Sequence, residues 1–261
     1  MQFYATTWCN MIRPYMPNRP YMLPASSWAR VNFKPPRLPP HITHVAADPG
    51  AFVATRVGDY SYSAADYVRW LDEIGPALQW AGTMDYCCFI HPRENQQRTT
   101  ERAYEMWRDY KDMEWVWVPT IQGDDLAAYV WHANSMKSLI TDMQRQGAAF
   151  RVGVGTLVSR PAADVARICA AVHGVLGQPL HAWGVKLSVL KQRQFQRGVI
   201  SIDTSAWDGQ FKRTRHESLA RRKTLGMSKA EFSYLVALPE YAAKIQAAVL
   251  PSKQLVMEEL K

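Results

Sequence analysis

Three aspartates that are far apart in the sequence share one local setting, because each one closes or follows an apolar, strand-like segment. They are Asp48, Asp85 and Asp203. Gln122 and Gly155 stand at the ends of two further segments of this kind. Of two carboxylates in one site, one can form a covalent bond to the substrate while the other moves protons. These residue types predict an enzyme if the fold brings the five segment ends together.

The elements that must position these residues alternate along the chain. Strands are expected at about 3–7, 21–26, 42–47, 80–86, 115–121, 150–154, 181–187 and 199–203. Helices are expected at 63–74, 97–112, about 125–143, 161–176, 217–223, 228–236 and 239–249, from helical spacing of apolar residues. Alternating strands and helices build a parallel sheet, and in a closed barrel the chemistry sits at the carboxyl ends of the strands.

The expected fold is therefore α/β, a single (β/α)8 TIM barrel over residues 1–261 with a helical C-terminal extension and no zinc subdomain. Residues 1–41 form a basic, proline-rich arm that also carries the first strands. Residues 42–210 form the barrel that bears the motifs, and 211–261 form a basic helical segment.

Positive charge is concentrated in two parts of a chain whose formal net charge is +8. Residues 1–47 contain no Asp or Glu and include Arg30 and Lys34. The second cluster contains Lys212, Arg213, Arg215, Arg221, Arg222 and Lys223. Two basic clusters favour a polyanionic partner, although a solvated, solubilising surface would have the same composition. Lys186, at the end of the seventh expected strand, is either a phosphate or base contact or a solvated strand end.

Membrane and zinc-binding classes fit this sequence poorly. No apolar run approaches the roughly 18 residues of a membrane span, and the first residues do not resemble a signal peptide. The four cysteines contain no C-x-x-C pair, and adjacent Cys87 and Cys88 are expected to pack as small buried groups. We therefore expect a reduced, cytoplasmic location, no metal and no membrane partner.

Read in order, the five segment ends resemble the motifs of the tRNA-guanine transglycosylase superfamily, most closely its short branch that inserts 7-deazaguanines into DNA. The matching segments are Asp48-Pro-Gly-Ala-Phe52, Met84-Asp85, Ile121-Gln122-Gly123, Val154-Gly155-Thr156-Leu157 and Ile202-Asp203 with Ser205-Ala-Trp207. They are similar to the family's Asp-Ser-Gly-Gly-Phe segment, its base-reading aspartate, its Val-Gln-Gly and Ile-Gly-Gly-Leu segments and its nucleophile strand. The resemblance covers roughly residues 44–210.

The resemblance implies two catalytic carboxylates. Asp203 would be the nucleophile, and Asp48 would be the acid and base. This division agrees with the chemistry of an N-glycosidic bond, which breaks through an oxocarbenium-like state. One carboxylate can trap that state as a covalent glycosyl intermediate while the other manages protons.

The resemblance also implies a pocket for a guanine-like base. The Asp85 carboxylate and the Gln122 carbonyl oxygen suit the donors on the Watson–Crick edge of the ring. The backbone at Gly123 and Gly155 can approach the ring's acceptor, because glycine has no Cβ. The candidates for stacking on the extruded base are Phe52, Tyr86 and Trp207.

The chain departs from the family pattern at three points. Pro49 replaces a Ser, Thr156 replaces the second Gly of the last turn, and no cysteine follows Cys169. The tRNA enzymes carry a Cys-rich zinc site after the nucleophile strand, so its absence favours the DNA branch. The expected partners are DNA, duplex or single-stranded, and a free 7-deazaguanine base, with no cofactor and with the need for a helper protein left open.

Three other functions remain as alternatives at this point. The same chemistry on tRNA is the nearest. A barrel hydrolase or lyase for a small phosphorylated molecule would need a phosphate cradle after strands seven and eight. Those loops offer Lys186, Ser188 and Thr204 but no glycine-rich nest. A catalytically inactive nucleic-acid-binding barrel is the last alternative, and the three aspartates argue against it.

Overall fold

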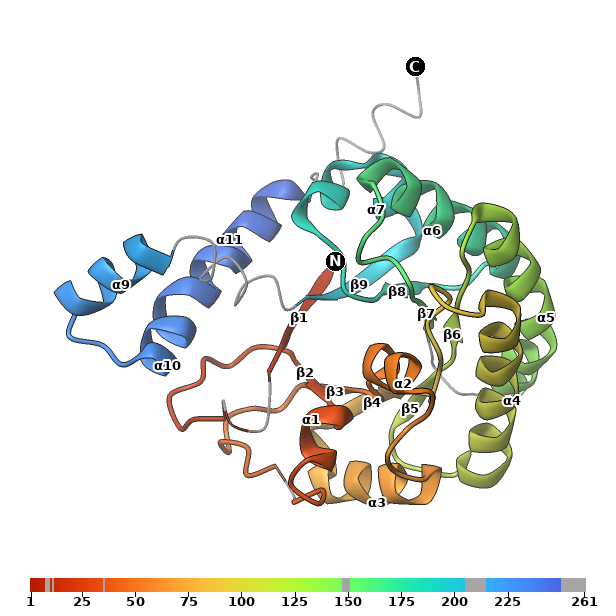
Figure 1. The fold of residues 1–261 in the computed structure, drawn as a ribbon, viewed down its shortest axis with the longest axis horizontal. Coiled ribbons are helices and arrows are strands. Elements are labelled where there is room, and N and C mark those ends of the chain that lie inside the picture. The colour runs from red at the N-terminus through yellow and green to blue at the C-terminus, as the bar shows by residue number, and fades with distance from the viewer. Residues whose placement is uncertain (8–9, 11, 35, 147–150, 205–214, 250–261) are drawn as a thin grey trace.

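The centre of the molecule is a parallel sheet that nearly closes on itself as a barrel, with helices around it (Figure 1). The computed structural model describes residues 1–7, 10, 12–34, 36–146, 151–204 and 215–249, with side chains of the last range from residue 219 onward. The strands are β1 (Gln2–Thr6), β2 (Tyr21–Pro24), β3 (Val45–Asp48), β4 (Leu78–Gly82), β5 (Val116–Val118), β6 (Thr120–Ile121), β7 (Val152–Val154), β8 (Leu180–Ala182) and β9 (Val199–Thr204). Their order in the sheet is β5-β4-β3-β2-β1-β9-β8-β7-β6, with parallel pairing throughout the described part.

The two ends of this order meet at Pro119. β5 and β6 are separated by that residue alone, and the sequence predicted one strand over the same segment. Proline has no N–H to donate to a ladder. Its carbonyl still accepts from Gly153 N at 2.8 Å, and the carbonyl of Val118 accepts from Thr83 N at 3.1 Å. The same short segment therefore pairs to β4 on one side and to β7 on the other, which brings the sheet round on itself.

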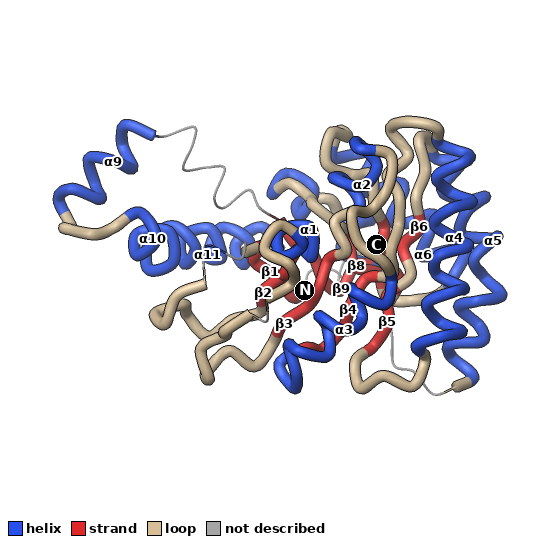
Figure 2. The backbone as a smooth tube through the Cα atoms, turned by 60° about the horizontal axis from the view of Figure 1, so that its bottom comes forward, coloured by secondary structure: helices blue, strands red, loops and turns tan. Residues whose placement is uncertain are grey.

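Helices connect the strands and cover the outside of the sheet (Figure 2). They are α1 (Ala25–Ala29), α2 (Ala51–Val57), α3 (Ala64–Ile74), α4 (Pro92–Tyr110), α5 (Leu126–Arg145), α6 (Ala162–Leu176) and α7 (Arg193–Gly198), with the short 3-10 turns η2 (Gly75–Ala77) and η3 (Leu187–Lys191). Ser63 caps α3 by accepting from Asp66 N, and Asp125 caps α5 by accepting from Ala128 N. None of the helices in the described ranges has the length and apolar run needed to cross a membrane.

Side chains on the two faces of the sheet form two cores. The larger core lies between the outer face and the helices, and includes Leu23, Val45 and Trp117. A smaller cluster fills the inside of the sheet, with Tyr4, Met22, Ala46, Trp80 and Val118 as its buried members. Residues that alternate along a strand point to opposite faces, so each strand contributes to both cores. The interior is thus packed, and a site can open only at a rim of the barrel.

The C-terminal helices form an extension beside β1 (Figure 1). They are α9 (Arg215–Thr224), α10 (Lys229–Phe232), the π-helical turn η4 (Ser233–Ala237) and α11 (Leu238–Ala248). The hydroxyls of Thr7 and Tyr234 share a hydrogen bond, and the rings of Phe3 and Tyr241 lie 6.0 Å apart. The extension is therefore held by the N-terminal strand and the residue that follows it.

Several elements differ from their expected bounds around the site. β4 ends at Gly82 and β8 at Ala182, four and five residues before the ends at 86 and 187 that the sequence predicts, because the following residues leave the sheet and turn toward the rim. α2 was not predicted, since the segment after Asp48 has the composition of a turn. Gly50 begins this helix from a left-handed conformation with φ of 89°. α4 starts at Pro92, since proline suits the first turn of a helix.

Candidate functional site

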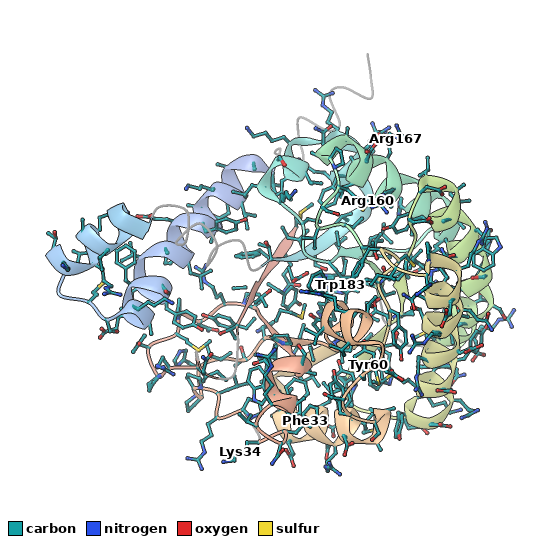
Figure 3. All side chains as sticks on the ribbon, viewed as in Figure 1. Phe33, Lys34, Tyr60, Arg160, Arg167 and Trp183 are labelled. Carbon is teal, nitrogen blue, oxygen red and sulfur yellow. The ribbon has the colours of Figure 1, made fainter. Side chains whose placement is uncertain are left out.

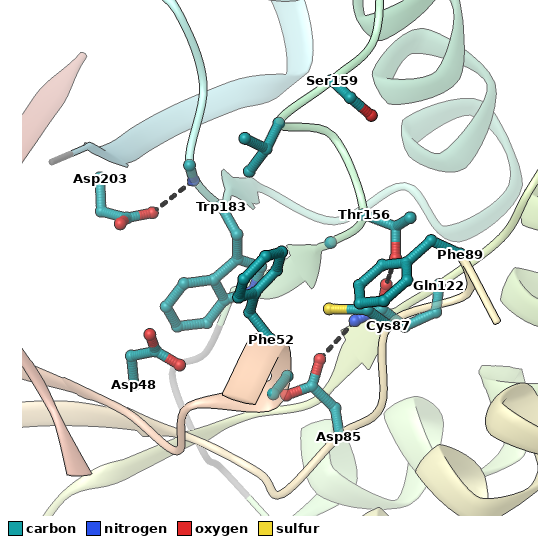
Figure 4. A pocket seen from close by; sticks show the side chains of 14 residues that line it. Asp48, Phe52, Asp85, Cys87, Phe89, Gln122, Thr156, Ser159, Trp183 and Asp203 are labelled. Atoms are coloured by element: carbon teal, nitrogen blue, oxygen red, sulfur yellow. Dashed lines mark hydrogen bonds between the residues drawn. The ribbon is translucent and has the colours of Figure 1, made fainter. Parts of the chain in front are cut away.

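A pocket of about 300 Å³ opens at the carboxyl ends of the strands (Figure 4). Six residues singled out in the sequence line it: Asp48, Phe52, Asp85, Gln122, Gly155 and Asp203. They belong to the ends of β3, β4, β6, β7 and β9 and to the start of α2. The parallel sheet therefore brings together at one rim residues that span more than 150 positions of the sequence.

Asp203 lies near the end of β9, buried and held by hydrogen-bond donors on both oxygens. Gly184 N donates to Oδ1 at 2.8 Å, and Thr6 Oγ1 donates to Oδ2 at 3.2 Å. The ring of the buried His181 lies beside it, with Nε2 3.4 Å from Oδ1. A carboxylate that is fixed in one position by its neighbours needs little rearrangement before it attacks a substrate. This geometry suits a nucleophile.

Asp48 is the last residue of β3, and its Oδ1 accepts from the backbone N–H of Gly50 at 2.7 Å. The turn requires glycine, because a Cβ at position 50 would lie 2.7 Å from the Cβ of Ser26. Burial raises the pKa of Asp48 to about 7, the charge of Asp203 adds to the rise, and the hydrogen bond from Gly50 opposes it. A carboxyl whose pKa lies near neutral pH can both give and take a proton.

Asp85 and Gln122 are joined in a buried network at the other side of the pocket. Gln122 Nε2 donates to Asp85 Oδ2, and Gln122 Oε1 accepts from the hydroxyl of Thr156 at 2.5 Å. The Thr156 hydroxyl in turn accepts from Cys88 N at 2.9 Å. Burial raises the pKa of Asp85 to about 8, with a further rise from the charge of Asp48 and an opposing effect of the Gln122 bond. The orientation of the amide is thus fixed before any ligand binds.

The surroundings of the two glycines show what a side chain at each position would meet. Gly155 N donates to the carbonyl of Ile121 at 3.0 Å, and its own carbonyl accepts from the hydroxyl of Tyr129 at 2.6 Å. A Cβ at Gly155 would lie 2.4 Å from Gln122 Nε2, so this glycine makes room for the amide. A Cβ at Gly123 would lie 2.8 Å from the ring of Tyr129, and Gly123 is not part of the pocket wall.

Three aromatic rings stand at the pocket. Phe52 and Phe89 are exposed at its opening, with ring centroids 5.6 Å apart. Trp183, which follows β8, forms the inner wall, and Figure 4 shows its ring between the carboxyl groups of Asp48 and Asp203. Flat rings of this kind suit a planar aromatic ligand. Trp183 was not predicted, although its place after an apolar strand is the same as that of the aspartates.

Of the other two stacking candidates, Tyr86 does not line the pocket. Tyr86 is buried, donates its hydroxyl to Asp59 at 2.6 Å, and carries the guanidinium of Arg98 at 3.7 Å from its ring centroid. Its ring is therefore already covered by other side chains. Trp207 lies outside the residues that the structure describes.

Arg30 and Lys34, the two basic candidates of the N-terminal arm, do not line the pocket. Arg30 and Lys34 are exposed, and Figure 3 shows Lys34 at the outer edge of the molecule, far from Trp183. Lys186 is exposed and lies three residues after Trp183 in the sequence.

The C-terminal cluster is described in part. Lys212 and Arg213 lie outside the described residues, and so does the side chain of Arg215. The guanidinium of Arg221 pairs with the carboxylate of Glu240 at 2.8 Å, which links α9 to α11. The side chains of Arg221 and Glu240 are 56% and 50% exposed. An ion pair this exposed to solvent is weak, so it competes little with a phosphate. Arg222 is partly buried on the same helix.

One further cation supports the rim. Arg160 donates to the carbonyls of Thr156 at 2.9 Å, Gly123 at 3.0 Å and Asp124 at 2.9 Å. It therefore ties the loop after β6 to the loop after β7, on which Gln122 and Thr156 are placed (Figure 3). This role could not be predicted from the sequence, because residue types do not reveal three backbone acceptors on other loops.

No protein-family model matches this chain, and no curated protein matches it. Within the described ranges, no group of three or more His, Cys, Asp and Glu side chains is arranged to hold a metal ion.

Proposed function

We propose that this chain is a base-exchange transglycosylase that replaces guanine in DNA with a 7-deazaguanine derivative. It would be a (β/α)8 barrel enzyme of the tRNA-guanine transglycosylase type, with β5 and β6 counted as one strand that Pro119 interrupts. The observation that carries the proposal is the meeting of Asp48, Asp85 and Asp203 in one pocket. The pocket volume of about 300 Å³ is at the small end of the range for ligand sites, which suits a single base.

The first half of the reaction releases guanine. An oxygen of the Asp203 carboxylate attacks C1′ of the target nucleoside, and a C1′–O bond forms as the bond from C1′ to the base nitrogen breaks. The electron pair of the broken bond leaves with the base, and Asp48 gives that base a proton. The pKa of Asp48, about 7, leaves a large share of this carboxyl protonated at neutral pH, so it is available as the acid.

The second half inserts the new base. The incoming 7-deazaguanine loses its ring N–H proton to Asp48, which the first half left as a carboxylate. The ring nitrogen then forms the bond to C1′, the C1′–O bond breaks, and its electron pair returns to Asp203. Two displacements at one carbon retain its configuration, as in retaining glycosidases. Both carboxyl groups end the cycle in their starting protonation states.

Base selection is assigned to Asp85. A guanine-like base presents an N–H and an amino group on its Watson–Crick edge, and an ionised carboxylate can accept from both. Gln122 Oε1 accepts one hydrogen bond from Thr156 and can accept a second one from the base. Adenine lacks the ring N–H, so it would leave a buried acceptor of Asp85 unpaired at a cost of about 1–3 kcal/mol.

The aromatic residues are assigned to the extruded base. Trp183 offers a wall inside the pocket, and Phe52 with Phe89 offers a lid at its opening. Taking a base out of the duplex stack costs a few kcal/mol, and stacking on these rings offsets part of that cost. DNA rather than tRNA is proposed because no cysteine follows Cys169 in this sequence, whereas the zinc site of the tRNA enzymes is rich in cysteine.

The proposal is tested by trapping the covalent intermediate. The protein is incubated with a guanine-containing DNA oligonucleotide without added base, denatured, and analysed by intact mass spectrometry. We expect an adduct with the wild type and a loss of several orders of magnitude with Asp203→Asn, where each tenfold corresponds to about 1.4 kcal/mol. Asp48→Asn should form the adduct slowly.

A matched control is Asp164→Asn, which removes a carboxylate from α6 on the outside of the barrel, where it faces Arg167 at 3.8 Å. This variant should form the adduct at the wild-type rate. The same assay with tRNA in place of DNA decides between the two substrates. An adduct with tRNA alone would overturn the choice of DNA, and an adduct that persists in Asp203→Asn would overturn the nucleophile.

A further inference from the structure

A chain of buried polar groups runs inside the barrel and ends at Asp203. It begins at Arg151, just before β7, whose guanidinium donates to Ser201 Oγ on β9 at 2.9 Å. Ser201 Oγ lies 3.0 Å from Nδ1 of His181 on β8. Nε2 of the same ring lies 3.4 Å from Asp203 Oδ1. His181, Ser201 and Asp203 are buried and Arg151 is partly buried, so the part of this chain nearest to Asp203 is shielded from water.

The His181 ring is held tightly by its aromatic neighbours. Its centroid lies 4.4 Å from that of Trp183, 4.7 Å from that of Trp80 and 6.1 Å from that of Tyr4, all in edge-to-face contact. Burial lowers the pKa of His181, opposed by its interaction with Asp203, so the neutral ring is favoured. A neutral imidazole carries a proton on one ring nitrogen only, and the hydrogen-bond partners of the two nitrogens decide which of them is protonated.

The Nε2 atom of the His181 ring lacks a hydrogen-bond partner within the part of the chain that the structure describes. Among the described residues, Nε2 of His181 has no hydrogen-bond partner of good geometry. Its distance to Asp203 Oδ1 is just beyond the usual N–H···O range of about 2.7–3.2 Å. A buried polar atom without a partner is costly, and the Asp203 carboxylate faces it. A small shift of the carboxylate would complete the bond.

The polar chain also selects the tautomer. Arg151 has donors only, so Ser201 Oγ accepts from it, and the Ser201 hydroxyl proton remains available to donate to Nδ1 of His181. This arrangement places the ring proton on Nε2. The opposite tautomer would turn a bare nitrogen lone pair toward the Asp203 carboxylate, which is repulsive.

We propose that His181 is a positioning residue for the nucleophile: Ser201 and Arg151 hold it as the Nε2–H tautomer, and it donates to Asp203 Oδ1 during the reaction. The role in catalysis rests on the proposed function, whereas the contact itself does not. His181 and Gly184 then hold Oδ1 together, and Oδ2 is the oxygen that attacks C1′.

The hydrogen bond from His181 Nε2–H to Asp203 differs in strength between the free carboxylate and the glycosyl ester. A carboxylate accepts a hydrogen bond more strongly than the carbonyl of an ester. Donation from Nε2–H therefore favours the free carboxylate over the glycosyl ester. It aids the second half of the reaction, in which the C1′–O bond breaks and the electron pair returns to Asp203. Loss of the donor should make the covalent adduct last longer.

The contact is tested first by NMR on protein labelled with ¹⁵N-histidine, with the His181 signals assigned by their loss in His181→Gln. We expect the Nε2–H tautomer in the wild type, a shift of the Nε2 signal in Asp203→Ala, and a shift of the Nδ1 signal in Ser201→Ala. A signal pattern of the Nδ1–H tautomer, or an Nε2 signal unchanged by Asp203→Ala, would overturn the proposal. This arm requires no enzymatic activity.

The catalytic role is tested by two substitutions that separate the ring nitrogens. The amide of His181→Gln reaches the place of Nε2 and can donate to Asp203, whereas the shorter His181→Asn reaches only the place of Nδ1. We expect His181→Asn to slow adduct breakdown by about 10- to 100-fold, the effect of one charge-assisted hydrogen bond, and His181→Gln to retain most of the rate. The control is His173→Asn on α6, whose Nδ1 contacts the carbonyl of Gln178 at 2.9 Å.

Equal breakdown rates in the Gln and Asn variants of His181 would overturn the positioning role, since a purely structural defect would not distinguish them. If the wild type forms no adduct with any nucleic acid, the proposed function fails, and the NMR result still decides whether His181 donates to Asp203. If either variant does not fold, Ser201→Ala takes its place, with slower adduct breakdown expected and an unchanged rate counting against the proposal.

Discussion

The side-chain amide of Gln122 donates a hydrogen bond to the carboxyl group of Asp85, so two pocket residues from neighbouring strands act as one unit. The hydroxyl of Thr156 fixes the other end of the amide. Because burial raises the pKa of Asp85 to about 8, this carboxyl is largely protonated at neutral pH while the pocket is empty. A base that presents two donors needs the ionised form, so its binding is expected to release a proton.

Base binding should therefore become tighter as the pH rises toward about 8. Below that pH the affinity for a free 7-deazaguanine should rise by up to about tenfold for each pH unit, because the carboxyl must lose its proton first. Calorimetry is best done in an Asp48→Asn background, so that only Asp85 titrates in this range. Asp85→Asn should remove the pH dependence and weaken the choice of guanine-like bases over adenine. An affinity that does not change between pH 6 and 8 would exclude this role.

The hydroxyl of Thr156 should affect the affinity for the base, because it orients the amide of Gln122. The backbone of Thr156 has φ of 54°, a conformation that favours glycine, so a threonine here is kept for its hydroxyl. Thr156→Ala should weaken base binding by about tenfold, the effect of one or two buried hydrogen bonds. Thr156→Ser keeps the hydroxyl and is the matched control. Equal affinities for the Ala and Ser variants would show that the hydroxyl does not act through Gln122.

Asp85 should also affect stability in a pH-dependent way. Its pKa is about 3.9 in an unfolded chain and about 8 in the folded protein, so the folded state binds more protons between these values. The stability that this group contributes is full below pH 4 and falls as the pH rises toward 8. Asp85→Asn removes that fall. The melting temperature of the variant minus that of the wild type should therefore be more positive at pH 8 than at pH 5.

The control for this measurement is Asp66→Asn at the start of α3. Hydrogen bonds from Ser63 lower the pKa of Asp66, so Asp66 is ionised throughout this range. Its effect on the melting temperature should be the same at pH 5 and pH 8. A difference between wild type and Asp85→Asn that stays constant with pH would contradict a protonated Asp85.

The basic C-terminal cluster is expected to hold the DNA backbone. Each phosphate contact that is lost lowers the slope of log affinity against log salt by about 0.7 to 0.9. Arg213→Ala/Arg215→Ala should therefore lower the slope in a salt titration, while Arg167→Ala on the outside of α6 should leave it unchanged. Arg221→Ala should lower the slope as well, because its exposed ion pair with Glu240 is weak and leaves the guanidinium available to a phosphate. Identical slopes for all variants would leave the cluster as a solvated surface.

The sequence predicted the helices and strands that extended hydrophobic patterns indicate. It did not predict the features that depend on contacts between distant residues. Asp48, Asp85 and Asp203 could be placed at one rim because parallel strands end there, and the alternation of strands and helices is plain in the sequence. The helix α2 was missed because Gly50 begins it from a left-handed turn. His181 was missed because a lone histidine in an apolar segment carries no signal of its neighbours.

The glycine at 155 shows the same limit in another form. Its lack of a Cβ was attributed to the approach of a base, and the structure adds that a Cβ there would also meet Gln122 Nε2. A sequence shows that a position excludes a side chain, but the group that occupies the space follows from packing. Trp183 and Arg160 belong to this class too, since their roles depend on atoms from other loops.

The most direct test of the central claim is mass spectrometry of the nucleosides in DNA that has been incubated with the protein and a free 7-deazaguanine. We expect a 7-deazaguanine deoxynucleoside to appear in the digest, one free guanine to be released for each base inserted, and neither product to form with Asp203→Asn. Unmodified DNA with every 7-deazaguanine offered, or exchange that continues in Asp203→Asn, would contradict the account.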